Sequence, residues 1–173
     1  MEYLRKYIRD IPDFPKEGIN FHDITPLLQN AAAFESAIRE MAKLLEDVRI
    51  DYLVGIEARG FIFASALAMK LNAGLVIIRK PGKLPYVTIN ASYDLEYGSD
   101  KLEMHSDAIQ EGSRVVLIDD LLATGGTAKA AGDLIKKLKG EVAGYCFLVE
   151  LTELGGKDRL APHEVWSVLK YKI

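Results

Sequence analysis

Two short apolar runs, each followed by a loop and a helix-like stretch, restrict this chain to a few folds. The segments are 52–56, 61–71 and 75–78 in the first unit, and 115–118, 125–138 and 142–149 in the second. Strands that alternate with helices favour a parallel sheet, because parallel strands need a long crossover connection. We therefore predict an α/β fold with an open, mainly parallel twisted sheet and helices on both faces.

The remaining segments predict additions to this sheet. Apolar residues recur with helical spacing from Phe34 to Val48, and weak alternation over 162–173 predicts a last edge strand. A short amphipathic piece at 3–8 precedes a Pro-bounded stretch, 12–26, that looks too irregular for a regular element. We expect one domain over 1–173, with a cap at 1–33.

The segment 79–112 separates the two units and is rich in Gly, Pro, Tyr and charged residues. Alternating pieces at 87–93 and around 102–104 predict a hairpin-like excursion with a mobile tip. This excursion is the expected flexible region of the domain.

Composition excludes several classes of protein. The formal net charge of −3 argues against binding nucleic acid through the overall field, although a local basic patch could still hold an anion. A single cysteine, Cys146, excludes intrachain disulfides and cysteine zinc clusters, and we expect it to be a buried, reduced thiol. The charged first twenty residues and the lack of an 18-residue apolar run predict a cytoplasmic protein without a membrane partner.

The segment 115–128 carries the clearest chemical signal. Four aliphatic residues are followed by Asp119 and Asp120, and then by a loop that opens a helix and contains Ala123, Thr124, Gly125, Gly126 and Thr127. Backbone N–H groups, threonine hydroxyls and a helix N-terminus together make a cradle for a phosphate. The two carboxylates could accept hydrogen bonds from vicinal sugar hydroxyls. The alternative is that the acids make only turn and capping bonds.

Other nucleotide motifs fail. Gly55 and Gly60 have the spacing of a Walker A loop, but Phe61 and Ile62 replace its Lys and Ser/Thr. No G-x-G-x-x-G sequence occurs. A local phosphate cradle in segment 119–127 is therefore the interpretation that remains.

The chain resembles the type I phosphoribosyltransferases, and within them the adenine branch. The motif that marks the superfamily is Ile118-Asp119-Asp120 through Ala123-Thr124-Gly125-Gly126-Thr127. Further signatures are Glu57-Ala58-Arg59-Gly60-Phe61, Arg79-Lys80-Pro81-Gly82-Lys83-Leu84-Pro85 and Leu148-Val149-Glu150-Leu151-Thr152. Two pieces mark the adenine branch, Phe21-x-Asp23-Ile24-x-Pro26 and Tyr93-x-x-Glu96-Tyr97-Gly98. The resemblance covers nearly the whole chain.

This resemblance implies transfer of a phosphoribosyl group from 5-phosphoribosyl-1-diphosphate to adenine, giving AMP and diphosphate in purine salvage. The loop 123–127 would hold the 5′-phosphate, and Asp119 and Asp120 the ribose hydroxyls. The diphosphate would lie on Glu57, Ala58, Arg59, Arg79, Lys80 and Lys83. The family uses Mg2+ held by substrate and water, so no metal cage of protein ligands is expected. For Arg59 and the basic cluster, solvated surface positions are the alternative.

The resemblance also implies a base site and a proton-transfer residue. Phe21 would stack on adenine, Leu160 would cover its opposite face, and Asn20 and His22 flank the base although both depart from the usual family residues. Glu96 would move the proton, and Tyr97 belongs to the loop that closes over the site. A buried structural role for His22 and an exposed loop position for Glu96 are the alternatives. The family is typically homodimeric, and a homodimer is expected here.

Three rival functions stay open at this point. Because His22 is unusual, an enzyme of the same class could use another 6-substituted purine. A non-catalytic regulator that binds nucleic acid would require a basic face, which the pI near 5.7 disfavours. A plain nucleotide-binding module would have no use for Lys83 and Glu96.

Overall fold

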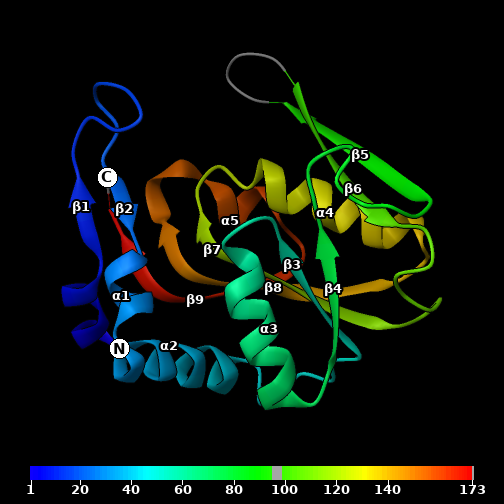
Figure 1. Ribbon diagram of the computed structural model, residues 1–173, viewed down its shortest axis with the longest axis horizontal. Helices are drawn as coiled ribbons and strands as arrows, with labels where there is room; N and C mark the ends of the chain where they lie inside the picture. The colour runs from blue at the N-terminus through cyan, green and yellow to red at the C-terminus, as the bar shows by residue number, and fades with distance from the viewer. Residues whose placement is uncertain (95–98, 173) are drawn as a thin grey trace.

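The computed structural model describes residues 1–94 and 99–172, and its centre is a five-stranded parallel sheet (Figure 1). The strand order is β4 (Gly74–Ile78), β3 (Tyr52–Ile56), β7 (Arg114–Leu122), β8 (Glu141–Leu151) and β9 (Glu164–Tyr171). Each neighbouring pair is parallel, and β9 is an edge strand as predicted. The predicted α/β class and parallel sheet are confirmed.

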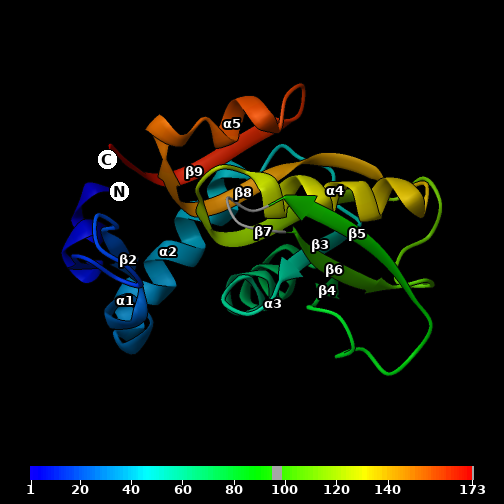
Figure 2. The ribbon, with the colours of Figure 1, turned by 90° about the horizontal axis from the view of Figure 1, so that it is seen from above.

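Helices cover both faces of this sheet. Helices α2 (Ala31–Leu44) and α3 (Gly60–Leu71) pack on one face, where their apolar side chains share a core with Leu53, Val116 and Cys146. Helix α4 (Gly126–Lys137) packs on the other face against Val54, Leu117 and Phe147. Figure 2 shows α3 and α4 on opposite sides of the strands. Both faces of the sheet are therefore buried. Because side chains on both faces are excluded from water, its strands contain continuous runs of aliphatic residues.

The boundaries of α2 differ from the prediction. The helix begins at Ala31, three residues before Phe34, because the Asn30 side chain accepts a hydrogen bond from the Ala33 N–H at 3.0 Å. It ends at Leu44 rather than Val48, although Leu45 and Val48 continue to pack against the core. The apolar residues at helical spacing thus continue beyond the C-terminal end of the helix.

The N-terminal segment is more regular than its sequence predicted. A 3-10 helix (η1, Glu2–Tyr7) leads into β1 (Arg9–Ile11), which pairs antiparallel with β2 (Phe21–Asp23) before α1 (Thr25–Gln29). The interpretation of 12–26 as wholly irregular was wrong, because this stretch includes β2 and the start of α1. Asp23 accepts a hydrogen bond from the Thr25 N–H at 2.9 Å, which secures the turn between them.

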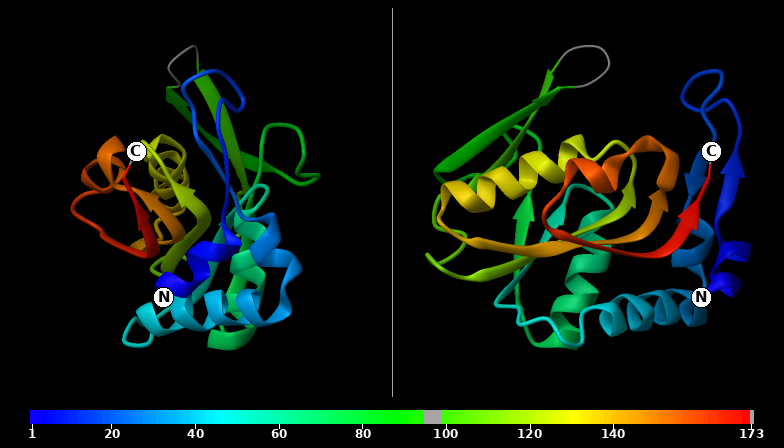
Figure 3. Two further views of the ribbon diagram at one scale, coloured as in Figure 1. Left: turned by 90° about the vertical axis from the view of Figure 1, so that its left-hand side faces the viewer. Right: turned by 180° about the vertical axis from the view of Figure 1, so that it is seen from behind.

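A two-stranded hairpin stands apart from the main sheet, as predicted for the excursion. Its strands are β5 (Thr88–Asp94) and β6 (Ser99–His105), and they pair antiparallel. Figure 3 shows this hairpin and the loop between β1 and β2 projecting on the same side of the molecule. The chain after β8 forms η2 (Thr152–Leu154) and the short helix α5 (Gly156–Arg159).

The apolar helix α3 is too short to cross a bilayer. It has 12 residues, whereas a span needs about 20. Within residues 1–94 and 99–172, none of the helices combines the length and the hydrophobicity of a membrane span. Residues Phe63, Ala64 and Leu67 of α3 are buried in the core of the domain.

Gly144 on β8 lies where β9 packs too closely for a larger side chain. A Cβ at this position would lie 2.6 Å from Cη2 of Trp166 and 2.8 Å from the Glu164 carbonyl oxygen. We expect Gly144→Ala to lower the free energy of unfolding by about 1–3 kcal/mol, the range found for overpacked cores. Urea unfolding measures the change. In a Gly144→Ala/Trp166→Phe double variant the loss should be smaller than the sum of the single losses, and additive losses would contradict this account.

Candidate active site

The candidate site is a cavity of about 380 Å³ where the carboxyl ends of β3 and β7 meet. In open α/β sheets, ligands bind beyond the carboxyl ends of the strands. The cavity is lined by Ile56, Glu57, Ala58, Arg59, Lys80, Tyr93, Leu102, Asp119, Asp120, Leu121 and Thr127. A second hollow of about 100 Å³ adjoins it, lined by Asp119, Phe147 and residues 121–128. Most of these residues were predicted to belong to the site; Ile56, Tyr93, Leu102 and Leu121 were not.

The loop before α4 has the shape of an anion cradle. Gly125 adopts a left-handed conformation with φ +79° at the N-cap of α4. A Cβ on Gly125 would lie 2.8 Å from the carbonyl oxygen of Gly156, so this position requires glycine both for its φ and for space. The first N–H groups of α4 have no partner within the helix and are available to a phosphate.

Asp119 and Asp120 lie within β7 and not beyond its end as predicted. The pairing of β7 with β8 continues past them, with Leu122 opposite Glu150, and this extends the strand. The Asp120 carboxylate is buried and pairs with Nε of Arg59 at 2.5 Å. Its N–H group donates to Oδ1 of Asp119 at 2.9 Å. Both acids nevertheless line the cavity, together with Glu57, Ala58 and Arg59.

The environment of Asp119 favours its protonated form. Burial and the neighbouring charge of Asp120 raise the pKa of Asp119 well above its usual value. The N-terminus of α3 lies close to the Asp119 side chain, since a Cβ on Gly60 would lie 2.9 Å from Oδ1 of Asp119. Little water reaches this buried carboxyl group. Sugar hydroxyls of a ligand could donate hydrogen bonds to its oxygens instead.

Glu57 gathers the basic residues that follow β4. Its Oε1 accepts from Lys83 Nζ at 2.8 Å and from Arg79 Nη2 at 3.1 Å. Its Oε2 accepts from the Lys80 N–H at 3.0 Å and from Arg79 Nε at 3.3 Å. Burial would raise the pKa of Glu57, but these donors outweigh it and lower the pKa to about 2. Glu57 is therefore a fixed negative charge inside the cluster that the family resemblance assigns to diphosphate.

Sequence reasoning missed the partners that hold Lys80. Its ammonium group donates to the hydroxyl of Tyr93 at 3.1 Å and forms an ion pair with Asp100. Tyr93 and Asp100 lie opposite each other in the β5–β6 pairing, so a correct hairpin register would have found both. Tyr93 and Leu102 also line the cavity, which connects the hairpin to the site.

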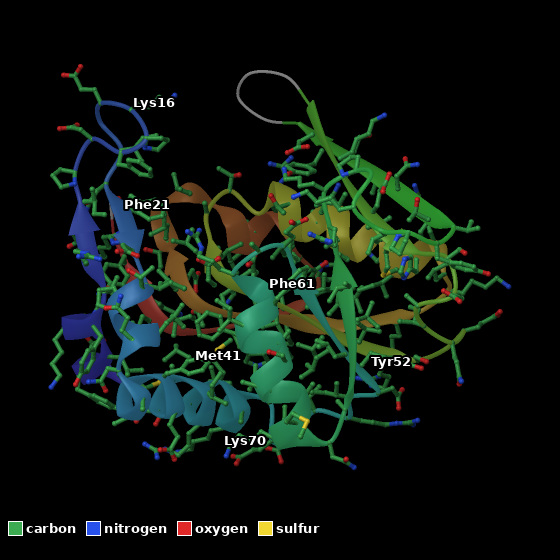
Figure 4. The ribbon with its side chains drawn as sticks, viewed as in Figure 1. Lys16, Phe21, Met41, Tyr52, Phe61 and Lys70 are labelled. Carbon is green, nitrogen blue, oxygen red and sulfur yellow. The ribbon has the colours of Figure 1, made fainter. Side chains whose placement is uncertain are left out.

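Phe21 lies beside the cavity on β2. The guanidinium carbon of Arg59 is 5.4 Å from the centre of its ring, and Phe14 meets the ring edge-on with centroids 5.2 Å apart. Figure 4 shows Phe21 on β2 and Phe61 at the start of α3. The half-buried ring of Phe21 thus has a face toward the residue that also binds Asp120.

The other predicted base contacts lie differently. His22 is buried, with Nδ1 2.7 Å from Asp10 and its ring 4.4 Å from that of Tyr171, so its side chain faces away from Phe21. A contact between residue 22 and a base would have to use the backbone. Asn20 is exposed, and Leu160 is 2% exposed and packs in the core beneath α4. Glu96 and Tyr97 lie outside the described residues.

Comparison with known proteins gives a consistent family match. The phosphoribosyl transferase domain model matches residues 23–171. An adenine phosphoribosyltransferase of Pseudothermotoga lettingae is 59% identical over 168 residues, covering 97% of this chain and 99% of the relative. One of Halothermothrix orenii is 56% identical over 167 residues, covering 96% and 98%.

Solved structures agree in fold. The crystal structure of adenine phosphoribosyltransferase from Thermoanaerobacter pseudethanolicus superimposes with a TM-score of 0.97 at 50% identity, covering 98% of this chain and 99% of the other. The enzyme from Saccharomyces cerevisiae gives a TM-score of 0.90 at 40% identity, with 96% of each chain covered. That yeast enzyme was crystallised with an imino-altritol bisphosphate and adenine.

Proposed function

The chain belongs to the adenine phosphoribosyltransferases, and we propose that it transfers the phosphoribosyl group of 5-phosphoribosyl-1-diphosphate to adenine. The products are AMP and diphosphate. One observation carries this function: the phosphate cradle of loop 123–127 and the cavity lined by Arg59 and Lys80 are neighbouring hollows that share Asp119 in their linings. A substrate with a phosphate at each end and a diol between them matches this order of groups.

We assign the substrate groups to these residues in order. The N–H groups and hydroxyls of Ala123, Thr124, Gly125, Gly126 and Thr127 bind the 5′-phosphate. Asp119 and Asp120 accept hydrogen bonds from the ribose hydroxyls. Arg79, Lys83 and the Lys80 N–H bind the diphosphate, and the Ala58 and Arg59 backbone borders it. This division is supported by the two neighbouring hollows: Asp120, Arg59 and Lys80 line one, residues 123–126 line the other, and Asp119 lines both.

The chemical step exchanges one bond at C1 of the ribose for another. The bond from C1 to the diphosphate oxygen breaks, and that oxygen takes the electron pair. A ring nitrogen of adenine then bonds to C1, and its surplus proton must leave. We propose Glu96 as the acceptor of this proton, because β5 and β6 carry the chain on both sides of it to the cavity through Tyr93 and Leu102.

Phe21 is the proposed stacking partner of adenine. Stacking of a base on an aromatic ring contributes about 1–3 kcal/mol in base-binding proteins. The ring lies next to Arg59, which links it to Asp120 on the ribose side. Leu160, and the backbone of Asn20 and His22, are proposed as the remaining contacts with the base.

We propose Mg2+ as the cofactor, held mainly by substrate oxygens and water. Oxygen donors suit this ion, and the carboxylates of Asp119 and Asp120 face the cavity where a diphosphate would lie. Among residues 1–94 and 99–172, no three acidic, histidine or cysteine side chains are grouped as a metal site. When bound, the ion would neutralise charge on the departing diphosphate.

A cytoplasmic location is proposed from the chemistry of Cys146. The thiol is fully buried, and this burial raises its pKa to about 12. Such a thiol is inert toward oxidation and gives the chain no disulfide to form in an oxidising compartment.

We propose a homodimer that uses the exposed apolar surface of α3 and β4. Met69 is 87% exposed and Leu75 on the edge strand β4 is 45% exposed. Such residues next to an edge strand favour burial against a second copy. We expect Met69→Asp/Leu75→Asp to convert a dimer into monomers, as measured by analytical ultracentrifugation, whereas Lys70→Asp should leave the dimer intact. A double variant that stays dimeric would contradict this interface.

The function is tested with a panel of bases. Purified protein, Mg2+ and 5-phosphoribosyl-1-diphosphate are offered adenine, hypoxanthine, guanine or xanthine, and nucleotide formation is followed. We expect rapid formation of AMP with adenine alone. Turnover of an oxo-purine would contradict the base assignment, and no turnover of any base would contradict the enzymatic function.

A further inference from the structure

The basic cluster after β4 already holds an anion that belongs to the protein. Three donor groups, from Arg79, Lys83 and the Lys80 backbone, converge on the carboxylate of Glu57 at 2.8–3.3 Å. Both carboxylate oxygens are used, each by two of the hydrogen bonds. This is the arrangement by which proteins bind a phosphate oxygen pair, with a carboxylate in its place.

Glu57 has little freedom to leave this position. Its side chain is 11% exposed, and its backbone N–H donates to the Ile78 carbonyl oxygen at 2.9 Å. It also stands at the junction between β3 and α3, whose first residue, Gly60, contacts β7 closely. The carboxylate is therefore a permanent neighbour of the three donors and is always ionised at neutral pH.

Glu57 cannot itself bind diphosphate through its side chain, because two anions repel each other. The donors that bind it are the ones required by the leaving group in the proposed function. A diphosphate that uses the same N–H groups of Arg79 and Lys83 takes hydrogen bonds that Glu57 otherwise accepts. This places a competitor for diphosphate inside the enzyme.

We propose that Glu57 is an internal counter-anion that competes with diphosphate for Arg79, Lys83 and the Lys80 N–H, and so limits the affinity of the enzyme for diphosphate. This inference rests on the proposed function. It makes Glu57 a positioning residue: it keeps the donors aligned when no ligand is bound and returns them to itself when diphosphate leaves. Product release is then assisted by an anion that is already in place.

The alternative role for Glu57 is purely structural, and it predicts a change of the opposite sign. If the carboxylate only keeps segment 79–83 in shape, its loss weakens diphosphate binding. If it competes, its loss frees two cations and strengthens binding. A measurement of affinity for inorganic diphosphate alone separates the two roles without any turnover.

The test is isothermal titration of inorganic diphosphate, with Mg2+, into wild type and Glu57→Gln. We expect the variant to bind at least about fivefold more tightly, since two charge-assisted donors are released. In steady-state assays its KM for 5-phosphoribosyl-1-diphosphate should fall, and its KM for adenine should stay the same. Unchanged or weaker diphosphate binding overturns the proposal.

Glu103→Gln is the matched control. Glu103 lies on β6 and accepts a hydrogen bond from the Gly82 N–H at 3.0 Å, so its replacement removes a negative charge beside segment 79–83 without freeing the side chains of Arg79 or Lys83. Its diphosphate affinity should stay within about twofold of wild type. An equal tightening in Glu103→Gln would reduce the effect to overall charge and overturn the proposal.

A second variant keeps the test decisive if Glu57→Gln does not fold. Glu57→Asp retains the charge but withdraws it by one methylene from the donors, so diphosphate should bind more tightly than to wild type. No tightening in this variant overturns the proposal. A wild-type protein that binds no diphosphate would instead contradict the proposed function, and the inference with it.

Discussion

Glu96→Gln is expected to lower kcat for AMP formation by at least tenfold, because a positioned acid–base group typically contributes about 10²- to 10⁴-fold. Glutamine keeps the size of the side chain but cannot accept the proton that leaves adenine. The KM for 5-phosphoribosyl-1-diphosphate should change little, because Glu96 is assigned to the base and not to the phosphates. Steady-state kinetics with adenine as the varied substrate measures both quantities.

The pH profile separates proton transfer from a merely structural role of Glu96. In wild type, kcat should fall at low pH as a carboxylate becomes protonated, and this limb should disappear in Glu96→Gln. Glu111→Gln is the control. Glu111 is an exposed acid that follows the hairpin in the chain, and its carboxylate pairs with Lys139. An acidic limb that persists unchanged in Glu96→Gln would contradict the assignment.

Asp120→Asn is expected to lower kcat/KM for 5-phosphoribosyl-1-diphosphate by roughly 10- to 150-fold, since a hydrogen bond to a charged group contributes about 1.5–3 kcal/mol. Asp120 is buried, and its carboxylate pairs with Arg59 at 2.5 Å. Asparagine removes the charge that orients Arg59 and one of the acceptors for the ribose hydroxyls. Initial rates at varied substrate, with adenine saturating, measure this loss.

Two controls make the Asp120→Asn result specific. Asp47→Asn removes an exposed charge on the turn after α2 and should leave the kinetics unchanged. A thermal unfolding curve shows whether Asp120→Asn is folded at the assay temperature. A folded Asp120→Asn variant with wild-type kcat/KM would contradict the role of the acidic pair.

Much of the site was predictable because it follows directly from strands and helices with strong patterns. The acidic pair and the loop 123–127 follow a buried strand and open a helix, and Glu57 to Arg59 follow the other strand in the same way. Parallel strands bring such positions to one edge of the sheet. The alternation of strands and helices thus placed both segments at this edge, and the family resemblance assigned both of them to one substrate.

What the sequence did not reveal depends on long-range contacts. The strand character of Asp119 and Asp120 comes from β8, which extends alongside them and supplies hydrogen-bond partners. Strand β2 exists because β1 pairs with it, and three-residue strands carry no detectable alternation. The burial of His22 against Asp10 and Tyr171 joins both ends of the chain, which no local pattern indicates.

The ion pairs of the basic cluster illustrate the same limit. Arg79, Lys80 and Lys83 were recognisable as an anion-binding cluster from their density and their resemblance to the family. That Glu57 would occupy their donors depends on the packing of β3 beside β4, which sets the distance between the two segments. Residue types predicted the chemistry, and tertiary packing decided which groups pair in the absence of a ligand.

The most direct test of the account is a crystal structure of the wild-type protein with AMP, diphosphate and Mg2+. The account predicts the 5′-phosphate on the N–H groups of loop 123–127, the ribose hydroxyls on Asp119 and Asp120, and the adenine against Phe21. It further predicts diphosphate on Arg79 and Lys83, with their hydrogen bonds to Glu57 broken or lengthened. A 5′-phosphate bound away from loop 123–127, or diphosphate bound away from the basic cluster, would contradict it.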